Sequence, residues 1–593
     1  MLEKESSSNQ QSFLSQMQIG KYMNVNGKTI GILFAVLVGA LVAYAAIGIR
    51  FLIHIAQLYS LGTFSENIYD FVDTLKWWQI LGSTVSGGLI ISFIYFFFMS
   101  EKKTGAIAEV MEAYTYKNRK MNIKDGIFSA ISAAIALGTG SGAGREAPVV
   151  HLGATLSVWV SDKLHLPPKM SRTLFGCGVA AAISASFNAP IAGVFFALEV
   201  ILGHYALHAF APIVISSVTA AIISRIHFGD FPAFIIPDYQ IISFYEFPAF
   251  LVLGFISAIF AMIITKSVFF ADDMASKLPF PPWARPPLGG LAVGLIAIFC
   301  PYILGVGYGT TDAALKNIIS FDLLCILIIA KIAVTSISLA FRYGSGIFSP
   351  SLLLGALVGG AFGFIISLIF PEQASNSGLY AIVGMGAVSS AVLGAPISTI
   401  LIIFELTGDY QITLALMAAV VTANMITNHY LESSSFFHLQ LKRKGIDHEG
   451  SRAQKLSRQI IVQNIMTNDF AVVVTDTDIE RVKNLILNSK NNSLFVVGDK
   501  FNIRGIITLN ELRHSLDSDN EIEEMNADKI CRQQNFHLST NDTLEQAIYL
   551  FKQTGEDFIA VLDDNDLTKI VGVLSQVELL RSYNKVLIEA EDL

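Results

Sequence analysis

The stretch Gly138–Ala154 reads GTGSGAGREAPVVHLGA and places a charged pair, Arg145 and Glu146, inside a long apolar sequence. The uncharged runs Ile127–Leu137 and Val149–Val160 flank the pair. Burying a carboxylate within a membrane segment is costly, so such a residue indicates a functional site. The glycines in this stretch would let backbone amides approach a ligand closely.

Pro148 suits the first turn of a helix, where a missing N–H has no effect. The stretch therefore predicts a helix N-terminus within the membrane. Its free amides and dipole attract an anion, and Glu146 stands where that anion would bind. Two other interpretations concern the glycines. They could be helix-packing positions, or the dinucleotide-type pattern Gly138-x-Gly140-x-x-Ala143, which lacks the strand and the βαβ unit it requires.

The pattern recurs about 200 residues later. Gly142–Ala154 aligns without gaps on Gly344–Ala356, with two shared glycines and a shared proline in the turn. A second match pairs Ala189–Glu199 with Ala395–Glu405. Two matches at nearly one offset predict an internal duplication. Paired segments interrupted by Gly and Pro in two halves indicate a binding site where the repeats meet.

The composition indicates a polytopic membrane protein. Hydrophobic residues make up 53% of the 593 residues, and the mean hydropathy is +0.55. Thr29–Ile49 and Ile80–Ser100 carry no charge and are long enough to cross a bilayer. This hydrophobicity excludes a soluble enzyme, and a net charge of −8 does not favour nucleic-acid binding. The spacing of the polar residues matches neither a metal site nor a catalytic triad.

The chain is expected to be all-α in its membrane part and α/β at its C-terminus. The basic cluster Lys442–Lys444 directly follows the last apolar segment and favours a cytoplasmic C-terminus. The N-terminus is expected on the same side, and the membrane to be a bacterial inner membrane. The predicted parts are a cytoplasmic N-terminal segment (1–28), a transport domain (29–440, with repeats of about 29–226 and 247–440), a linker (441–460) and two small domains (461–518 and 525–587).

The two small domains each show the order βαββα and resemble a CBS-domain pair. Gly505-Ile-Ile-Thr-Leu-Asn-Glu511 and Gly572-Val-Leu-Ser-Gln-Val-Glu578 match that family's Gly-x-x-Ser/Thr-x-x-acid signature. In that family the acid is usually Asp and binds the ribose of an adenine nucleotide. The resemblance implies possible nucleotide contacts at Thr508, Glu511, Ser575 and Glu578. Because both acids are Glu here, a purely structural, dimerising pair is the other interpretation.

The membrane motifs resemble the CLC family of chloride channels and proton-coupled chloride transporters. The resemblance rests on Gly144-Arg-Glu-Ala-Pro148, Phe187-Asn-Ala-Pro-Ile-Ala-Gly193 and Gly346-Ile-Phe-Ser-Pro350, in the family's order. It implies a homodimer in the bilayer, with one anion pathway and two inverted repeats in each subunit. Glu146 matches the gating glutamate, whose carboxylate competes with the anion when ionised and swings out when protonated.

The resemblance also implies the chloride-binding residues. These are Gly144, Arg145, Glu146 and Ala147 of the first repeat, the backbone amides of Ile347 and Phe348 in the second, and positions 105 and 437. At the last two positions the family's serine and tyrosine are replaced by Gly105 and Phe437. The inner glutamate that carries protons in many antiporters is replaced by Val200. With both hydroxyls missing, we expect weaker anion binding at the central site.

The sequence therefore predicts chloride transport without a required cofactor, as passive, channel-like conduction gated by Glu146 and regulated by the CBS pair. Proton-coupled chloride exchange stays open, because some members of the family exchange protons without a carboxylate at the position of Val200. An alternative of a different class is a non-conducting membrane sensor that signals through the CBS pair.

Overall fold

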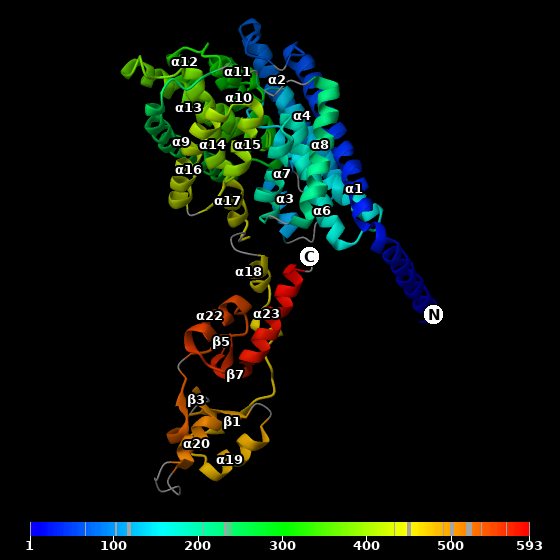
Figure 1. Cartoon of the computed structure of the whole chain (residues 1–593), viewed down its shortest axis with the longest axis vertical. Coiled ribbons are helices and arrows are strands. Elements are labelled where there is room, and N and C mark those ends of the chain that lie inside the picture. Colours follow the sequence, from blue (N-terminus) through cyan, green and yellow to red (C-terminus); the bar gives the residue numbers. More distant parts are fainter. Residues whose placement is uncertain are drawn as a thin grey trace. The chain divides into compact units, whose positions relative to one another are not determined.

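The computed structural model divides the chain into two compact units, Met1–Ile446 and Asp447–Leu593, here named the membrane unit and the α/β unit (Figure 1). Side chains are described from Thr29 onward. The described residues are 2–65, 67–100, 103–115, 120–204, 207–229, 234, 237, 239–431, 433–446, 452–489, 492–498, 503–517, 525–534, 536–564 and 566–591.

The membrane unit is built from helices, which Figure 1 shows as two halves side by side, blue to cyan and green to yellow. The helices of the first half are α1 (Leu2–Leu61), α2 (Trp77–Phe98), α3 (Ile107–Thr115), α4 (Ile123–Gly138), α5 (Glu146–Lys163), α6 (Pro168–Phe187), α7 (Pro190–Phe196) with the π-helical turn Ala197–Leu202, and α8 (Leu207–Phe228). Those of the second half are α9 (Phe247–Lys277), α10 (Arg285–Phe299), α11 (Tyr308–Leu315), α12 (Phe321–Ala340), α13 (Phe348–Ile369), α14 (Ser377–Leu393), α15 (Pro396–Thr407), α16 (Tyr410–Leu431) and α17 (Phe436–Arg443).

The two halves correspond helix by helix, α1–α8 to α9–α16. The correspondence confirms the duplication that the sequence predicts, because α5 and α13 begin 202 residues apart and α7 and α15 begin 206 apart. Within the described part of the chain, seven helices are long and apolar enough to cross a membrane. The helix α1 begins at Leu2, so its backbone continues through the segment that the sequence places before the first span.

Glycines bring the helices of each half into backbone contact. A Cβ on Gly153 of α5 would lie 2.6 Å from the carbonyl oxygen of Gly178 on α6. In the second half a Cβ on Gly355 of α13 would lie 2.3 Å from the carbonyl oxygen of Gly384 on α14. Small residues allow such close approach between membrane helices, where packing replaces the hydrophobic effect as the driving force. Equivalent glycine contacts therefore hold α5 against α6 in the first half and α13 against α14 in the second.

The α/β unit contains two small sheets. In the first, β1 (Ala471–Val474) runs parallel to β2 (Ser493–Val497), and β2 is followed by antiparallel β3 (Ile503–Thr508) and β4 (Arg532–Gln533). In the second, β5 (Leu538–Ser539), β6 (Phe558–Asp563) and β7 (Asp566–Ser575) follow the same pattern. The helices are α18 (Arg452–Ser457), α19 (Ile479–Asn488), α20 (Leu509–Asp517), α21 (Ala527–Ile530), α22 (Leu544–Thr554) and α23 (Gln576–Glu591).

Two short segments are exchanged between the halves of the α/β unit. Thr467, which precedes β1 in the chain, pairs with Val573 of β7 in the second sheet. In the opposite direction, β4, which directly precedes β5 in the chain, pairs with β3 of the first sheet. Phe495 and Ile506 of the first sheet form one core cluster with Ala560 and Val573 of the second. The two βαββα units predicted from the sequence thus share a core.

Candidate anion-binding site

The N-termini of α5 and α13 meet backbone to backbone. The amide of Gly144 donates to the carbonyl oxygen of Gly346 at 2.8 Å. Gly346 has a φ of +102°, and a Cβ there would lie 2.6 Å from the carbonyl oxygen of Gly144. Only glycine tolerates this conformation and this closeness together. The two repeats therefore place two helix N-termini, each with unpaired amides, at one point inside the membrane unit.

Glu146 is the first residue of α5 and is fully buried. Its carboxylate accepts hydrogen bonds from three donors. The Tyr308 hydroxyl lies 2.9 Å from Oε1, the Ser349 hydroxyl 2.5 Å from Oε1, and the Ser349 amide 3.3 Å from Oε2. Ser349 is in the first turn of α13, so the carboxylate occupies an anion position at that helix N-terminus.

Arg145 lies over the ring of Tyr308, whose hydroxyl donates to Glu146. Its guanidinium lies 4.5 Å from the ring centroid of Tyr308, and its Nη2 donates to the carbonyl oxygen of Ser186 at 3.0 Å. A cation over an aromatic face is stabilised by the ring quadrupole. Arg145 thus fixes the ring whose hydroxyl donates to Glu146, and adds positive charge near the site.

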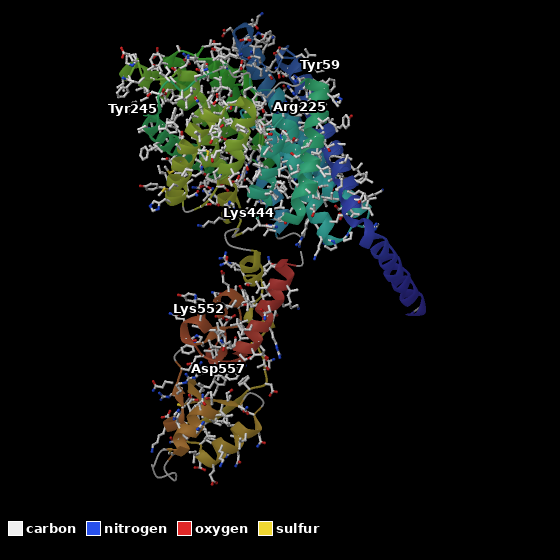
Figure 2. All side chains as sticks on the ribbon, in the orientation of Figure 1. Tyr59, Arg225, Tyr245, Lys444, Lys552 and Asp557 are labelled. Atoms are coloured by element: carbon white, nitrogen blue, oxygen red, sulfur yellow. The ribbon has the colours of Figure 1, made fainter. Side chains whose placement is uncertain are left out.

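A cavity of about 340 Å³, here named the large cavity, reaches the start of α13. Three of the predicted binding residues, Ala147, Ile347 and Phe437, line it. Its described lining also includes four basic residues, Lys103, Arg342, Arg443 and Lys444, and two acidic ones, Glu109 and Asp272. Figure 2 shows Lys444 at the edge of the membrane unit opposite Tyr59, which marks the side on which the cavity lies. The excess of positive charge favours anions in this cavity.

Gly105 lies next to a different cavity from Ala147, Ile347 and Phe437. It borders a second cavity, of about 200 Å³, here named the small cavity, together with His151. A Cβ on Gly105 would lie 2.5 Å from the His151 ring, so the imidazole fills the space of a side chain at this position. The large cavity is lined instead by the neighbours Thr104 and Ala106, and by Ser345, whose hydroxyl donates to the Gly105 carbonyl at 3.2 Å.

The remaining predicted positions are apolar. The Phe348 side chain packs on Phe187 and Phe196, with ring centroids 5.1 and 5.8 Å away, so that Phe348 offers its backbone. Val200 is buried in the π-helical turn that follows α7. A π-helical turn often marks a functional position, but valine has no proton to exchange.

Glu199 and Glu405 form reciprocal helix caps, as their matching repeat positions suggest. Glu199 accepts from the amides of Ile397 and Ser398 at 3.1 and 2.8 Å, at the start of α15. Glu405 accepts from the amides of Ile191 and Ala192 at 2.9 and 2.8 Å, at the start of α7. Each carboxylate thus satisfies the orphan amides of the other repeat.

In the α/β unit the two signature acids differ in their contacts. Glu511 accepts from the amide of Thr508 at 2.9 Å and from its hydroxyl, and pairs with Arg532 at 3.2 Å. Glu578 accepts from the Ser575 hydroxyl at 3.2 Å. The carboxylate of Glu511 is therefore already engaged by protein groups where a ribose would have to bind.

Three site residues were missed by the sequence analysis. Ser349 stands in the second copy of the central motif, and only its identity as a hydroxyl residue could have drawn attention to it. Tyr308 carries no sequence signal, because the contact spans 162 residues. Lys331 is a charged residue in the middle of the apolar helix α12, whose other charge, Asp322, lies in the first turn, and that signal was available. Among the described residues no group of His, Cys, Asp and Glu could hold a metal ion.

Comparisons with known proteins identify the families to which the two units belong. Residues 87–428 match the family model described as voltage gated chloride channel, and residues 462–518 and 527–585 match the CBS domain. The chain is 27% identical to chloride channel protein CLC-e of Arabidopsis thaliana, over 74% of this chain and 69% of that protein. It is 30% identical to the H(+)/Cl(-) exchange transporter ClcA of Vibrio cholerae, over 53% of this chain and 69% of that protein.

Solved structures give the same fold. A eukaryotic CLC transporter superposes with a TM-score of 0.63 at 17% identity and covers 94% of this chain and 99% of its own. A slow cyanobacterial Cl⁻/H⁺ antiporter superposes with a TM-score of 0.62 at 20% identity, over 70% of this chain and 97% of its own.

Proposed function

Because the chain belongs to the voltage gated chloride channel family, we propose that it conducts chloride passively across a membrane along a pathway gated by Glu146. The observation that carries the proposal is the buried Glu146 carboxylate on the N-terminus of α13, next to a basic cavity that reaches Ile347. An anion entering that cavity meets the amides of α13 and then the carboxylate. Conduction requires the carboxylate to leave, and protonation removes the charge that holds it.

Proton-coupled exchange is the second candidate. Two findings favour it, namely the similarity to a protein named H(+)/Cl(-) exchange transporter and the fold shared with a Cl⁻/H⁺ antiporter. Val200 argues for passive conduction, since an exchanger must deliver protons to Glu146 and valine carries none. Exchange would need a water-filled path past Val200.

A reconstitution experiment separates the two. Purified protein in liposomes, with equal chloride on both sides and a pH gradient, should give a zero-current voltage near zero. A voltage that follows the proton gradient and disappears in Glu146→Gln would replace conduction by exchange. If no anion flux occurs at any pH, anion transport itself is wrong.

We further propose that the protein is a homodimer with both termini in the cytoplasm of a bacterial cell. The CBS pair regulates conduction and binds adenine nucleotides weakly or not at all, because Glu511 is engaged by Thr508 and Arg532. A thermal-shift titration with ATP, ADP and AMP tests this, and a large saturable stabilisation would contradict it.

A further inference from the structure

Lys331 is a fully buried lysine in the middle of α12, a membrane-spanning helix. Its Nζ has no hydrogen-bond partner among the residues that the structure describes. The proposed pathway through Glu146 and the large cavity does not use it. A buried ammonium without a partner is costly, so its presence calls for an acceptor.

The ammonium lies at the start of α11. A Cβ on Gly307, the N-cap residue of that helix, would be 3.5 Å from Nζ. Gly307 has a φ of +91° and, as a glycine, offers no side chain to cap the helix. The helix dipole and the ammonium thus place positive charge at one buried point.

The start of α3 in the first repeat corresponds to the start of α11, and it has a different side chain in the place of Lys331. At the offset of 202 residues Gly307 corresponds to Gly105, Lys331 to Ser129 and Leu353 to His151. The structure preserves this arrangement, since a Cβ on Gly105 would touch His151 and one on Gly307 would touch Leu353. In the first repeat the Ser129 hydroxyl oxygen accepts the Gly105 amide at 2.6 Å.

In the second repeat that acceptor is replaced by a donor. A protonated lysine has three N–H groups and no lone pair, so it cannot accept an amide hydrogen. The helix amides and Lys331 therefore bring several donors to the start of α11, where the described acceptors include Asn67 Oδ1 beside Gly309. A species with lone pairs and a negative charge would accept from the helix amides and from the Lys331 ammonium.

We propose that Lys331 and the N-terminus of α11 bind a small inorganic anion of the halide class, at a site separate from the one beside Ile347. The site is coupled to the gate through Tyr308, which follows Gly307 and donates to Glu146. An anion that passes Glu146 would enter this positive region next. The inference rests on the proposed anion transport for the route by which the anion arrives.

Anomalous diffraction from crystals of the full chain soaked in bromide tests the site directly. We expect a bromide peak in contact with Lys331 Nζ, because a charge-assisted contact holds an anion there. The Ser129 position serves as an internal control, and no peak is expected there. Lys331→Met, which keeps the side-chain length without the charge, should lose the peak, and Lys331→Arg should keep it.

Chloride flux in liposomes gives the second readout. The half-saturating chloride concentration should rise about fivefold or more in Lys331→Met, because a nearby buried charge interacts strongly with an anion. Lys331→Arg should stay within about twofold of the original chain. Lys266→Met, which removes an exposed lysine from the membrane-spanning helix α9, should change nothing.

The outcomes separate this site from the proposed function. Bromide beside Ile347 with only water at Lys331, or a peak that persists in Lys331→Met, overturns the site and leaves anion transport standing. Absence of flux at every pH would contradict the transport proposal, whereas a bromide peak at Lys331 would still support this site.

Discussion

The two repeats carry the same backbone at α5 and α13 but different side chains. Glu146 in the first repeat corresponds to Phe348 in the second, and its carboxylate reaches across to Ser349 on α13. At α7 and α15 the repeats instead keep the same acid, and Glu199 and Glu405 cap each other's helices with matching contacts. Symmetric acids can satisfy each other's backbone permanently. Glu146 has no such counterpart, and it is the acid to which the proposed function assigns gating.

The largest effect on stability is expected when the backbone contact between Gly144 and Gly346 is disturbed. Gly346→Ala places a Cβ 2.6 Å from the Gly144 carbonyl oxygen at a φ of +102°. We expect the membrane unit to lose about 3 kcal/mol or more, from strain and overpacking together. Thermal unfolding in detergent measures this loss. Gly48→Ala is the matched control, since a Cβ there has open space on α1. Equal stability of both variants would contradict the close helix contact.

The symmetric acids should matter for stability and not for gating. Glu199→Ala and Glu405→Ala each leave two helix amides without an acceptor, which costs about 1–3 kcal/mol. Because Glu199 also accepts from the Ser398 hydroxyl, its loss should equal that of Glu405 or exceed it by about 1 kcal/mol. Unfolding temperatures measure the losses, and liposome flux should keep its pH profile. An altered pH profile in either variant would remove the distinction between symmetric and asymmetric acids.

The asymmetric acid should show the opposite behaviour. Glu146→Gln removes the charge that binds the Ser349 amide, as protonation would. Flux at neutral pH should rise about tenfold if a gate that is mostly closed becomes mostly open. The variant should also lose its dependence on external pH. Glu199→Ala is the control that keeps this dependence, and a Glu146→Gln profile like that of the original chain would show that the gate lies elsewhere.

The sequence predicted the repeats and helix starts well, because glycine, proline and uncharged runs act locally. Pro148 and Pro350 placed the starts of α5 and α13 correctly within a few residues. The partners of Glu146 could not be predicted, since Tyr308 and Ser349 are brought to it only by the meeting of the two repeats. The sequence also could not predict where a side chain at position 105 would point. An alignment assigns a position in the chain but not the face of the backbone from which a side chain projects.

A smaller effect, on chloride affinity, is expected from substitutions at positions 437 and 105. Phe437 lines the large cavity near Ile347, whereas a side chain on Gly105 would collide with His151. Phe437→Tyr should therefore tighten chloride binding by about 0.5–1.5 kcal/mol, the value of one hydrogen bond. Gly105→Ser should give no gain in affinity. Calorimetry measures both, and tighter binding by Gly105→Ser alone would show that its side chain reaches the anion after all.

The smallest effect concerns Glu511 in the α/β unit. Burial alone would raise its pKa, but the hydrogen bonds from Thr508 and the charge of Arg532 outweigh it and hold the pKa of Glu511 below its ordinary value of 4.5. A carboxyl with a lowered pKa stabilises the fold above the ordinary value, and this stabilisation is lost as the pH falls through the folded-state pKa. Because the Arg532 side chain is 49% exposed, screening keeps the contribution below about 1 kcal/mol.

Glu511→Gln should therefore destabilise the α/β unit at pH 7, and the difference from the original chain should shrink as the pH falls below 4.5. Arg532→Met should show part of the same loss, because it removes one cause of the lowered pKa. The difference in the free energy of unfolding of the α/β unit is measured by denaturant unfolding of the full chain at several pH values between pH 7 and pH 3.5. If the difference grows toward acid pH, the sign of the pKa shift is wrong and the contacts from Thr508 and Arg532 do not stabilise the ionised carboxylate of Glu511.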